Sequence, residues 1–246
     1  MERTKYKITL LLLILAVSEI TASYRSEIYD SYISGNMAKW KQVMDRMAEE
    51  KSSDPAVIME LVNYQYGYIG WAIGIKKNDE ARHYLELAEK NLDRAEKYPA
   101  YRSVINAYRS AFYGFRIGLN KVLAPFLGGK SLDAARKAIE QDDRNYLGYV
   151  QLGNAEFYMP AAFGGSKAEA IKYYTRAQEI MESDPRNTIG NWNYLSLLTV
   201  IAQSYLYTRQ FEKSRSYLDR ILEIEPGFAW VKNELYKELH DKMNSR

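Results

Sequence analysis

Gly128-Gly129-Lys130-Ser131 has the residue types that end a phosphate-binding loop, and it is the first candidate for chemistry in this sequence. That loop also requires a glycine at position 124, between a strand and a helix, but the residue there is Ala124. A similar segment containing Gly164-Gly165 follows 36 positions later, so the glycines belong to an internal repeat. We therefore do not expect a nucleotide to bind here.

Both glycine pairs follow a proline and precede a serine, which suggests a long turn inside a helical hairpin. Pro125 and Pro160 would each end the first helix because proline has no amide hydrogen. The glycines would allow left-handed backbone dihedral angles. Ser131 and Ser166 would then cap the helix that follows.

Residues that could form a catalytic or metal site are scarce. His83 and His240 are the only histidines and cysteine is absent, which leaves no multi-histidine or thiolate metal site. Glu80 and His83 have the Glu-x-x-His spacing of a di-metal helix, but such sites need two copies, so we expect His83 to be an exposed surface residue. We predict no enzyme, no cofactor and no metal. A hydrolase that uses carboxylates with tyrosine stays open as a third alternative.

The charge balance argues against nucleic acid as a partner. Lysine and arginine number 34 against 31 aspartates and glutamates, a formal net charge of +3, and no run of basic residues stands out. Nucleic-acid binding would require a basic patch that neutralises phosphates.

Residues 1–23 have the pattern of a secretory signal peptide. Arg3, Lys5 and Lys7 precede the apolar run Ile8–Val17, and small residues follow it. The run is too short to span a bilayer as a helix. Without a lipobox cysteine, we expect a periplasmic or secreted protein with no membrane span after cleavage. An uncleaved anchor is the alternative.

Beyond residue 23 the sequence predicts helices only, because apolar residues recur at three- and four-residue spacing and turn residues separate the segments. The expected helices cover residues 24–34, 37–50, 55–76, 78–97, 100–119, 131–141, 146–158, 167–183, 190–208, 211–224 and 227–242. Whether the first hairpin packs on the others or reaches another subunit stays open.

Within residues 195–228, large, small and proline residues occupy the slots of a 34-residue repeat. The matching positions are Leu198, Ile201, Ala202, Tyr205, Phe211, Ser214, Leu218, Ile221 and Pro226. This segment resembles a tetratricopeptide repeat, and residues 146–187 resemble a second one with an insertion. The resemblance implies an all-α, right-handed α-α superhelix as a single domain over residues 24–246, with 227–242 as the capping helix.

Aromatic residues are the main candidates for binding, since the chain contains 22 tyrosines and tyrosine is a good interface anchor. The inner wall of such a stack is formed by the first helix of each hairpin. We expect it to carry Tyr66, Asn106, Tyr113, Arg116, Asn154, Tyr158, Phe163, Gln203 and Tyr207.

The tetratricopeptide resemblance implies a scaffold in the cell envelope that binds a protein or peptide partner without a cofactor. The alternative is a small-molecule component: the looped repeats resemble the helical T-component of tripartite solute transporters. That role would require an enclosed pocket or a pore near the Gly-Gly turns.

Overall fold

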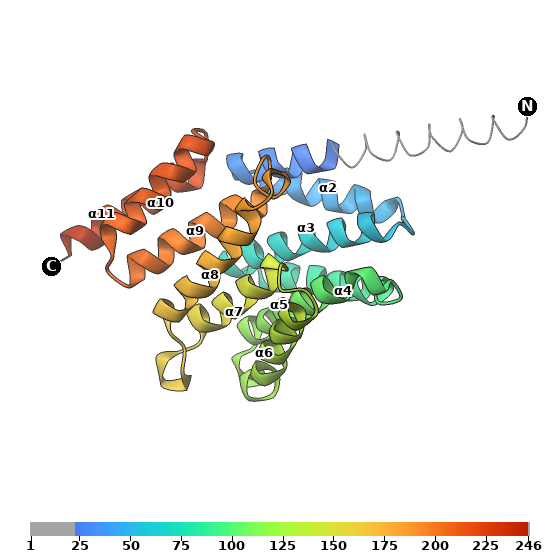
Figure 1. Ribbon diagram of the computed structural model, residues 1–246. Helices are drawn as coiled ribbons and strands as arrows, with labels where there is room; N and C mark the ends of the chain where they lie inside the picture. Colours follow the sequence, from blue (N-terminus) through green and yellow to red (C-terminus); the bar gives the residue numbers. More distant parts are fainter. Residues whose placement is uncertain (1–22, 246) are drawn as a thin grey trace, which may run out of the picture.

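The computed structural model describes residues 23–245, and every regular element in that range is a helix (Figure 1). The predicted all-α fold is thereby confirmed. The predicted signal peptide lies outside the described residues, apart from Ser23. Among residues 23–245, no helix combines the length and the apolar character needed to cross a membrane.

The helices follow one another with short connections. The first covers residues 23–34, followed by α2 (Met37–Glu49), α3 (Pro55–Gly74), α4 (Asn78–Ala95), α5 (Arg102–Leu119), α6 (Ala124–Gln141), α7 (Tyr146–Tyr158), α8 (Lys167–Glu182), α9 (Trp192–Tyr207) and α10 (Phe211–Ile224). A π-helical stretch, Val231–Leu235, leads into α11 (Tyr236–Asn244). Short 3-10 helices occupy Pro99–Tyr101, Lys121–Leu123, Ala161–Phe163 and Pro185–Asn187.

Successive helices pack in pairs, α3 with α4, α5 with α6, α7 with α8 and α9 with α10, and each pair contacts the next. Local caps fix where the helices start. Asp54, Asn145 and Ser166 accept hydrogen bonds from the first amides of α3, α7 and α8. Lys76 and Arg209, with φ angles of 63° and 61°, turn the chain after α3 and α9. The tetratricopeptide assignment and the superhelix stay predictions.

The helix predicted at 131–141 begins earlier, at Ala124, so the interpretation of its glycine pair as a turn was wrong. The chain turns at Asn120, whose side chain accepts a hydrogen bond from the Val122 amide at 3.2 Å. Pro125 lies in the first turn of α6, where a missing amide removes no hydrogen bond. Ser131 is inside α6 rather than at its cap, and its Oγ donates to the Ser110 carbonyl at 2.8 Å.

The first helix joins the two ends of the described chain. Its Tyr32 ring packs on Trp40 of α2, Trp192 of α9 and Phe228, with centroids 6.1, 5.7 and 5.0 Å apart. Gly67 of α3 permits this closure, because a Cβ there would lie 2.7 Å from Trp192 and 2.8 Å from Trp40. Figure 1 shows the first helix, in blue, next to α9 and α10. The first hairpin therefore packs on its own chain.

Candidate functional site

The nine side chains predicted to line a groove do not form one wall. Tyr66 and Asn154 belong to a hydrogen-bonded network between α3 and α7, whereas Asn106, Tyr113 and Arg116 lie on α5, Gln203 is half-buried on α9, and Tyr158, Phe163 and Tyr207 are exposed. The structure brings together two groups, the network and the exposed rings of α7 and α9.

The interior network is centred on Gln151 of α7. Its Nε2 donates to the Tyr66 hydroxyl at 3.3 Å, and its Oε1 accepts from Asn154 at 3.2 Å. Asn154 also accepts from the Tyr174 hydroxyl at 2.8 Å. The Tyr66 ring stacks on Phe115 with centroids 5.5 Å apart. Burial raises the pKa of Tyr66, and hydrogen bonds with Gln151 and Asn154 partly offset this. These groups satisfy one another, so the network holds α3 against α7.

Two of the predicted residues on α5 are engaged in helix packing. Asn106 is 6% exposed, and its amide donates to Gln141 of α6 at 2.8 Å. The Arg116 guanidinium donates to both carboxylate oxygens of Glu89 on α4, at 2.7 and 2.5 Å. Asn106 therefore joins the two helices of one hairpin, α5 and α6, whereas Arg116 joins α5 to α4 of the preceding hairpin.

Two exposed aromatic residues, Tyr158 and Tyr207, lie at the C-terminal ends of α7 and α9. Phe157 packs edge-on against Tyr158 and Tyr207, with ring centroids 4.9 and 5.9 Å apart. Tyr158 is 72% exposed and Tyr207 is 42% exposed. A cluster of exposed rings on a helical surface is typical of a binding site, because aromatic side chains contribute much of the energy at protein interfaces.

Two lysines complete this cluster. Lys167 Nζ lies 5.2 Å from the centroid of Phe157 and 5.9 Å from that of Tyr207, and Lys242 Nζ lies 4.9 Å from that of Tyr207. Within residues 23–245 neither lysine forms an ion pair. We call Phe157, Tyr158, Lys167, Tyr207 and Lys242 the aromatic–lysine surface. Sequence reasoning missed both lysines, since their positions depend on the α7–α8 turn and on the packing of α11.

The α7–α8 turn places Lys167. After Met159 the chain passes through the 3-10 helix Ala161–Phe163 and then through Gly164, which has a left-handed φ of 96°. Ser166 accepts a hydrogen bond from the Glu169 amide at 3.2 Å, which starts α8. The Ser166 amide donates to Glu156 of α7 at 3.1 Å. These contacts tie the start of α8 back to α7, so Lys167 lies over the Phe157 ring.

Tyr207 is held as a neutral hydrogen-bond donor. Its hydroxyl donates to Glu238 of α11 at 3.0 Å. Burial raises the pKa of Tyr207 to about 12, and the hydrogen bond and the negative charge of Glu238 contribute to the rise. At neutral pH this hydroxyl is protonated, so it fixes the ring position rather than acting as a base.

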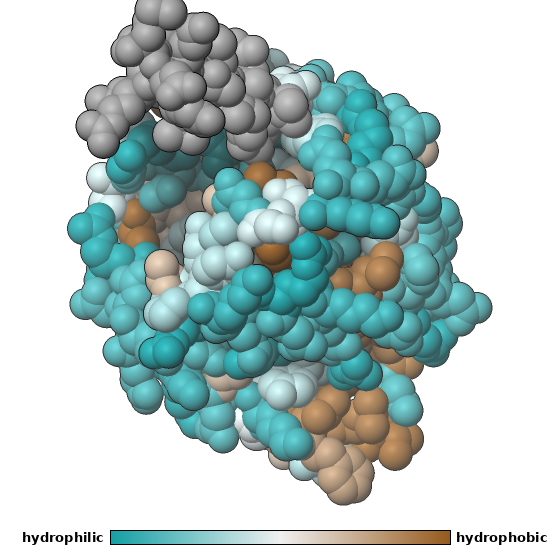
Figure 2. All heavy atoms as spheres, turned by 90° about the vertical axis from the view of Figure 1, so that its right-hand side faces the viewer, coloured by the Kyte–Doolittle hydropathy of each residue, from teal (hydrophilic) through white to brown (hydrophobic). Residues whose placement is uncertain are grey.

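A second exposed apolar group lies where α5 joins α6, at Val122 and Phe126. Figure 2 shows a hydrophobic patch at the lower end of the molecule, where both the α5–α6 corner and the α7–α8 turn lie in Figure 1. Among the described residues no cation lies over the Phe126 ring, in contrast to the lysines over Phe157 and Tyr207.

The residues that suggested metal chemistry have other roles. His83 is exposed on α4, as expected, with its ring edge-on to Tyr84. Glu80 accepts a hydrogen bond from the Tyr68 hydroxyl at 2.6 Å and pairs with Lys77 at 3.4 Å. In the described part of the chain, no three His, Cys, Asp or Glu side chains are grouped so as to hold a metal ion.

No protein-family model matches this sequence, and no curated protein is significantly similar to it.

Proposed function

We propose that this chain is an exported scaffold protein of the cell envelope, which binds a segment of a partner protein at the aromatic–lysine surface. The tetratricopeptide-like pattern of residues 195–228 and the signal-like residues 1–23 support the class and the location. The observation that carries the proposal is the cluster formed by the exposed Tyr158 and Tyr207 rings around the half-buried Phe157, with two lysines against them that form no ion pair within residues 23–245. Binding here involves no cofactor and no chemical step.

The chemistry of this surface defines the partner segment. The rings of Tyr158 and Tyr207 offer apolar contact area, which an apolar side chain of the partner would cover. Lys167 and Lys242 each offer an ammonium group that forms no ion pair among the described residues, and an acidic side chain of the partner would pair with it. The partner segment therefore has an acidic residue next to an apolar one.

We test this proposal with peptides selected from a random library on the immobilised wild-type protein. Selected peptides should pair acidic with apolar residues, and their affinity should fall as salt concentration rises because the ion pairs are exposed. Tyr158→Ala should weaken binding about tenfold or more, since truncation of an interface aromatic commonly costs 1–2 kcal/mol or more. Fluorescence polarisation of a labelled peptide measures each affinity.

Charge reversal provides the matched control. Lys167→Glu/Lys242→Glu should abolish peptide binding. Lys137→Glu/Lys237→Glu makes the same charge change at exposed lysines of α6 and α11. It should change the peptide affinity by less than about threefold, because charges outside an interface contribute little to its affinity. Equal losses in the two double variants would contradict the proposal, as would a selection that enriches no peptide.

Small-molecule handling is a second candidate function, because the chain contains a separate pocket between α2, α3 and α4. The resemblance to a solute-handling component predicts a pocket near the Gly-Gly segments, but this pocket includes no residue of either segment.

A further inference from the structure

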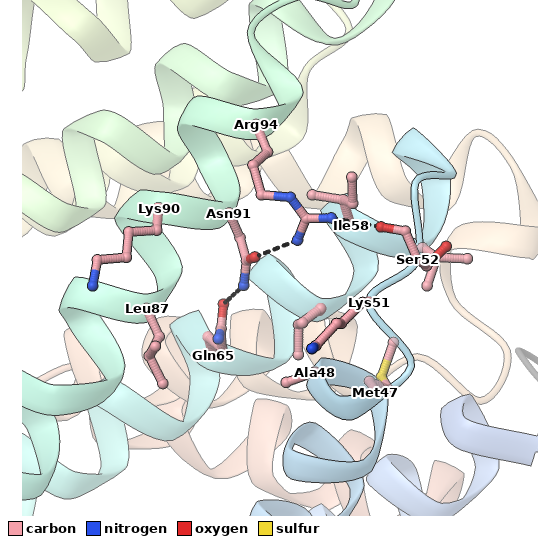
Figure 3. Close-up of a pocket in the computed structure, with 12 residues that line it drawn as sticks. Met47, Ala48, Lys51, Ser52, Ile58, Gln65, Leu87, Lys90, Asn91 and Arg94 are labelled. Atoms are coloured by element: carbon pink, nitrogen blue, oxygen red, sulfur yellow. Dashed lines mark hydrogen bonds between the residues drawn. The ribbon is translucent and has the colours of Figure 1, made fainter.

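A pocket of about 230 Å³ opens between the end of α2, the start of α3 and the second half of α4 (Figure 3). It is remote in sequence from the aromatic–lysine surface and shares no residue with it. Pockets for drug-sized ligands commonly have volumes of about 300–1,000 Å³, so this one fits a smaller molecule.

The floor of the pocket is apolar. Met47, Val57, Ile58 and Leu61 are buried, and Leu87 of α4 is half-buried beside them. These side chains come from three helices that the hydrophobic core holds together. The floor therefore provides a fixed apolar surface that a ligand could cover.

The side of the pocket formed by α4 is built from hydrogen-bonded polar groups (Figure 3). Arg94 donates to the Ser52 carbonyl at 2.6 Å and to Asn91 at 3.0 Å, and Asn91 donates to Gln65 at 3.1 Å. Gln65 is 1% exposed, and its Oε1 accepts the hydrogen bond from Asn91. The Ser52 carbonyl and the Asn91 side chain thus fix the position of the Arg94 guanidinium at the pocket.

The charged side chains that line the pocket are all positive. Lys51, Lys90 and Arg94 line it, and no aspartate or glutamate of residues 23–245 does. Within the described residues none of the three forms an ion pair. The positive φ of Lys51, 48°, ends α2 at the pocket, and Arg94 is held by the Ser52 carbonyl. A concave site lined by cations with low-dielectric walls concentrates anions.

We infer that this pocket binds a small amphipathic anion, with the anionic group between Lys51 and Arg94, a short apolar chain on the floor and Lys90 adding positive charge on the far side of Asn91 (Figure 3). A cation would meet three like charges, and a neutral apolar molecule would leave those charges unpaired. The anion also provides acceptors for the Arg94 guanidinium. Carboxylates and sulfonates share this chemistry.

Four probes with the same six-carbon chain test the inference by isothermal titration calorimetry on the full chain. Hexanoate and 1-hexanesulfonate should bind, 1-hexanol at least tenfold more weakly, and hexylamine not at all. Preference for hexanoate over the sulfonate would identify a carboxylate ligand. Across butanoate, hexanoate and octanoate, affinity should rise about fourfold per methylene, because each buried methylene contributes about 0.8 kcal/mol.

Variants locate the binding and serve as controls. Lys51→Gln/Lys90→Gln should weaken 1-hexanesulfonate at least fivefold, and Leu87→Trp should abolish binding by filling the pocket. Lys130→Gln/Lys237→Gln removes two exposed lysines elsewhere and should leave affinity unchanged. Equal binding of 1-hexanol and 1-hexanesulfonate, or equal losses in the two double-lysine variants, would overturn the inference. Absence of binding by every anion would also overturn it.

Discussion

Two segments of similar sequence, 125–131 and 160–166, fold differently. Both run from a proline through an aromatic residue and two glycines to a serine. The first is entirely helical and forms the start of α6, whereas the second is the turn between α7 and α8. The same residue types therefore serve as a helix in one hairpin and as a connection in the next.

The difference comes from what precedes each proline. Before Pro125 the chain has already turned at Asn120, and the 3-10 helix Lys121–Leu123 leads into α6 in a helical conformation. Before Pro160, Met159 ends α7 with an extended ψ of 132°, as residues preceding proline prefer. One proline is thus inside the first turn of a helix, and the other begins a loop.

The two outcomes have different consequences for the surface. The loop at 160–166 brings Lys167 over Phe157 and forms part of the aromatic–lysine surface. The helical segment leaves Phe126 exposed at the α5–α6 corner without a cation on its ring among the described residues. An internal sequence repeat therefore does not make the two corners equivalent in function.

The largest expected contrast is between the second glycines of the two pairs. A Cβ at Gly165 would lie 1.9 Å from the Met159 carbonyl oxygen, so Gly165→Ala should lower the free energy of unfolding by about 2–4 kcal/mol. A Cβ at Gly129 would meet no described atom within 4 Å. Because Gly129 lies inside a helix, Gly129→Ala should raise the free energy of unfolding by about 0.5–1 kcal/mol. Urea denaturation measures the free energy of unfolding of both variants, and changes of the same sign would contradict this prediction.

The corresponding serines should give a smaller contrast. Ser166 is a helix N-cap, where aspartate performs as well as serine, so Ser166→Asp should change the free energy of unfolding by less than about 0.5 kcal/mol. Ser131 donates to the Ser110 carbonyl, and a carboxylate there would face that oxygen with no hydrogen to donate. Ser131→Asp should therefore destabilise by about 1–3 kcal/mol. Thermal unfolding of the two variants compares them directly, and equal effects would mean that both serines have the same role.

The fold was largely predictable because the local signals agree with one another. The predicted helices 55–76, 78–97 and 211–224 match α3, α4 and α10 closely, since apolar periodicity and turn residues mark both of their ends. The start of α6 was not predictable in this way. Its Gly-Gly pair disfavours a helix locally, and tertiary contacts stabilise it instead: Ala135 and Ala138 are buried further along α6, and Ser131 bonds to the Ser110 carbonyl of α5.

The candidate site was predictable only in part. Helical spacing correctly placed Asn154 and Tyr158 on α7, but it could not show that Tyr66 of α3 would contact the same helix through Gln151. It also could not show that Lys242 of α11 would lie over Tyr207 of α9, because that contact depends on the packing of distant helices. Spacing identifies a face of a helix, and tertiary packing decides which residues of that face stay accessible.

Photo-crosslinking at the two corners tests the central claim most directly. A benzophenone amino acid is placed at position 158 in one protein and at position 126 in another, and each is irradiated with a peptide selected on the wild type. The proposed function predicts a crosslinked product from position 158 and none from position 126. Crosslinking from position 126 alone, or to the same extent from both, would contradict the assignment of binding to the aromatic–lysine surface.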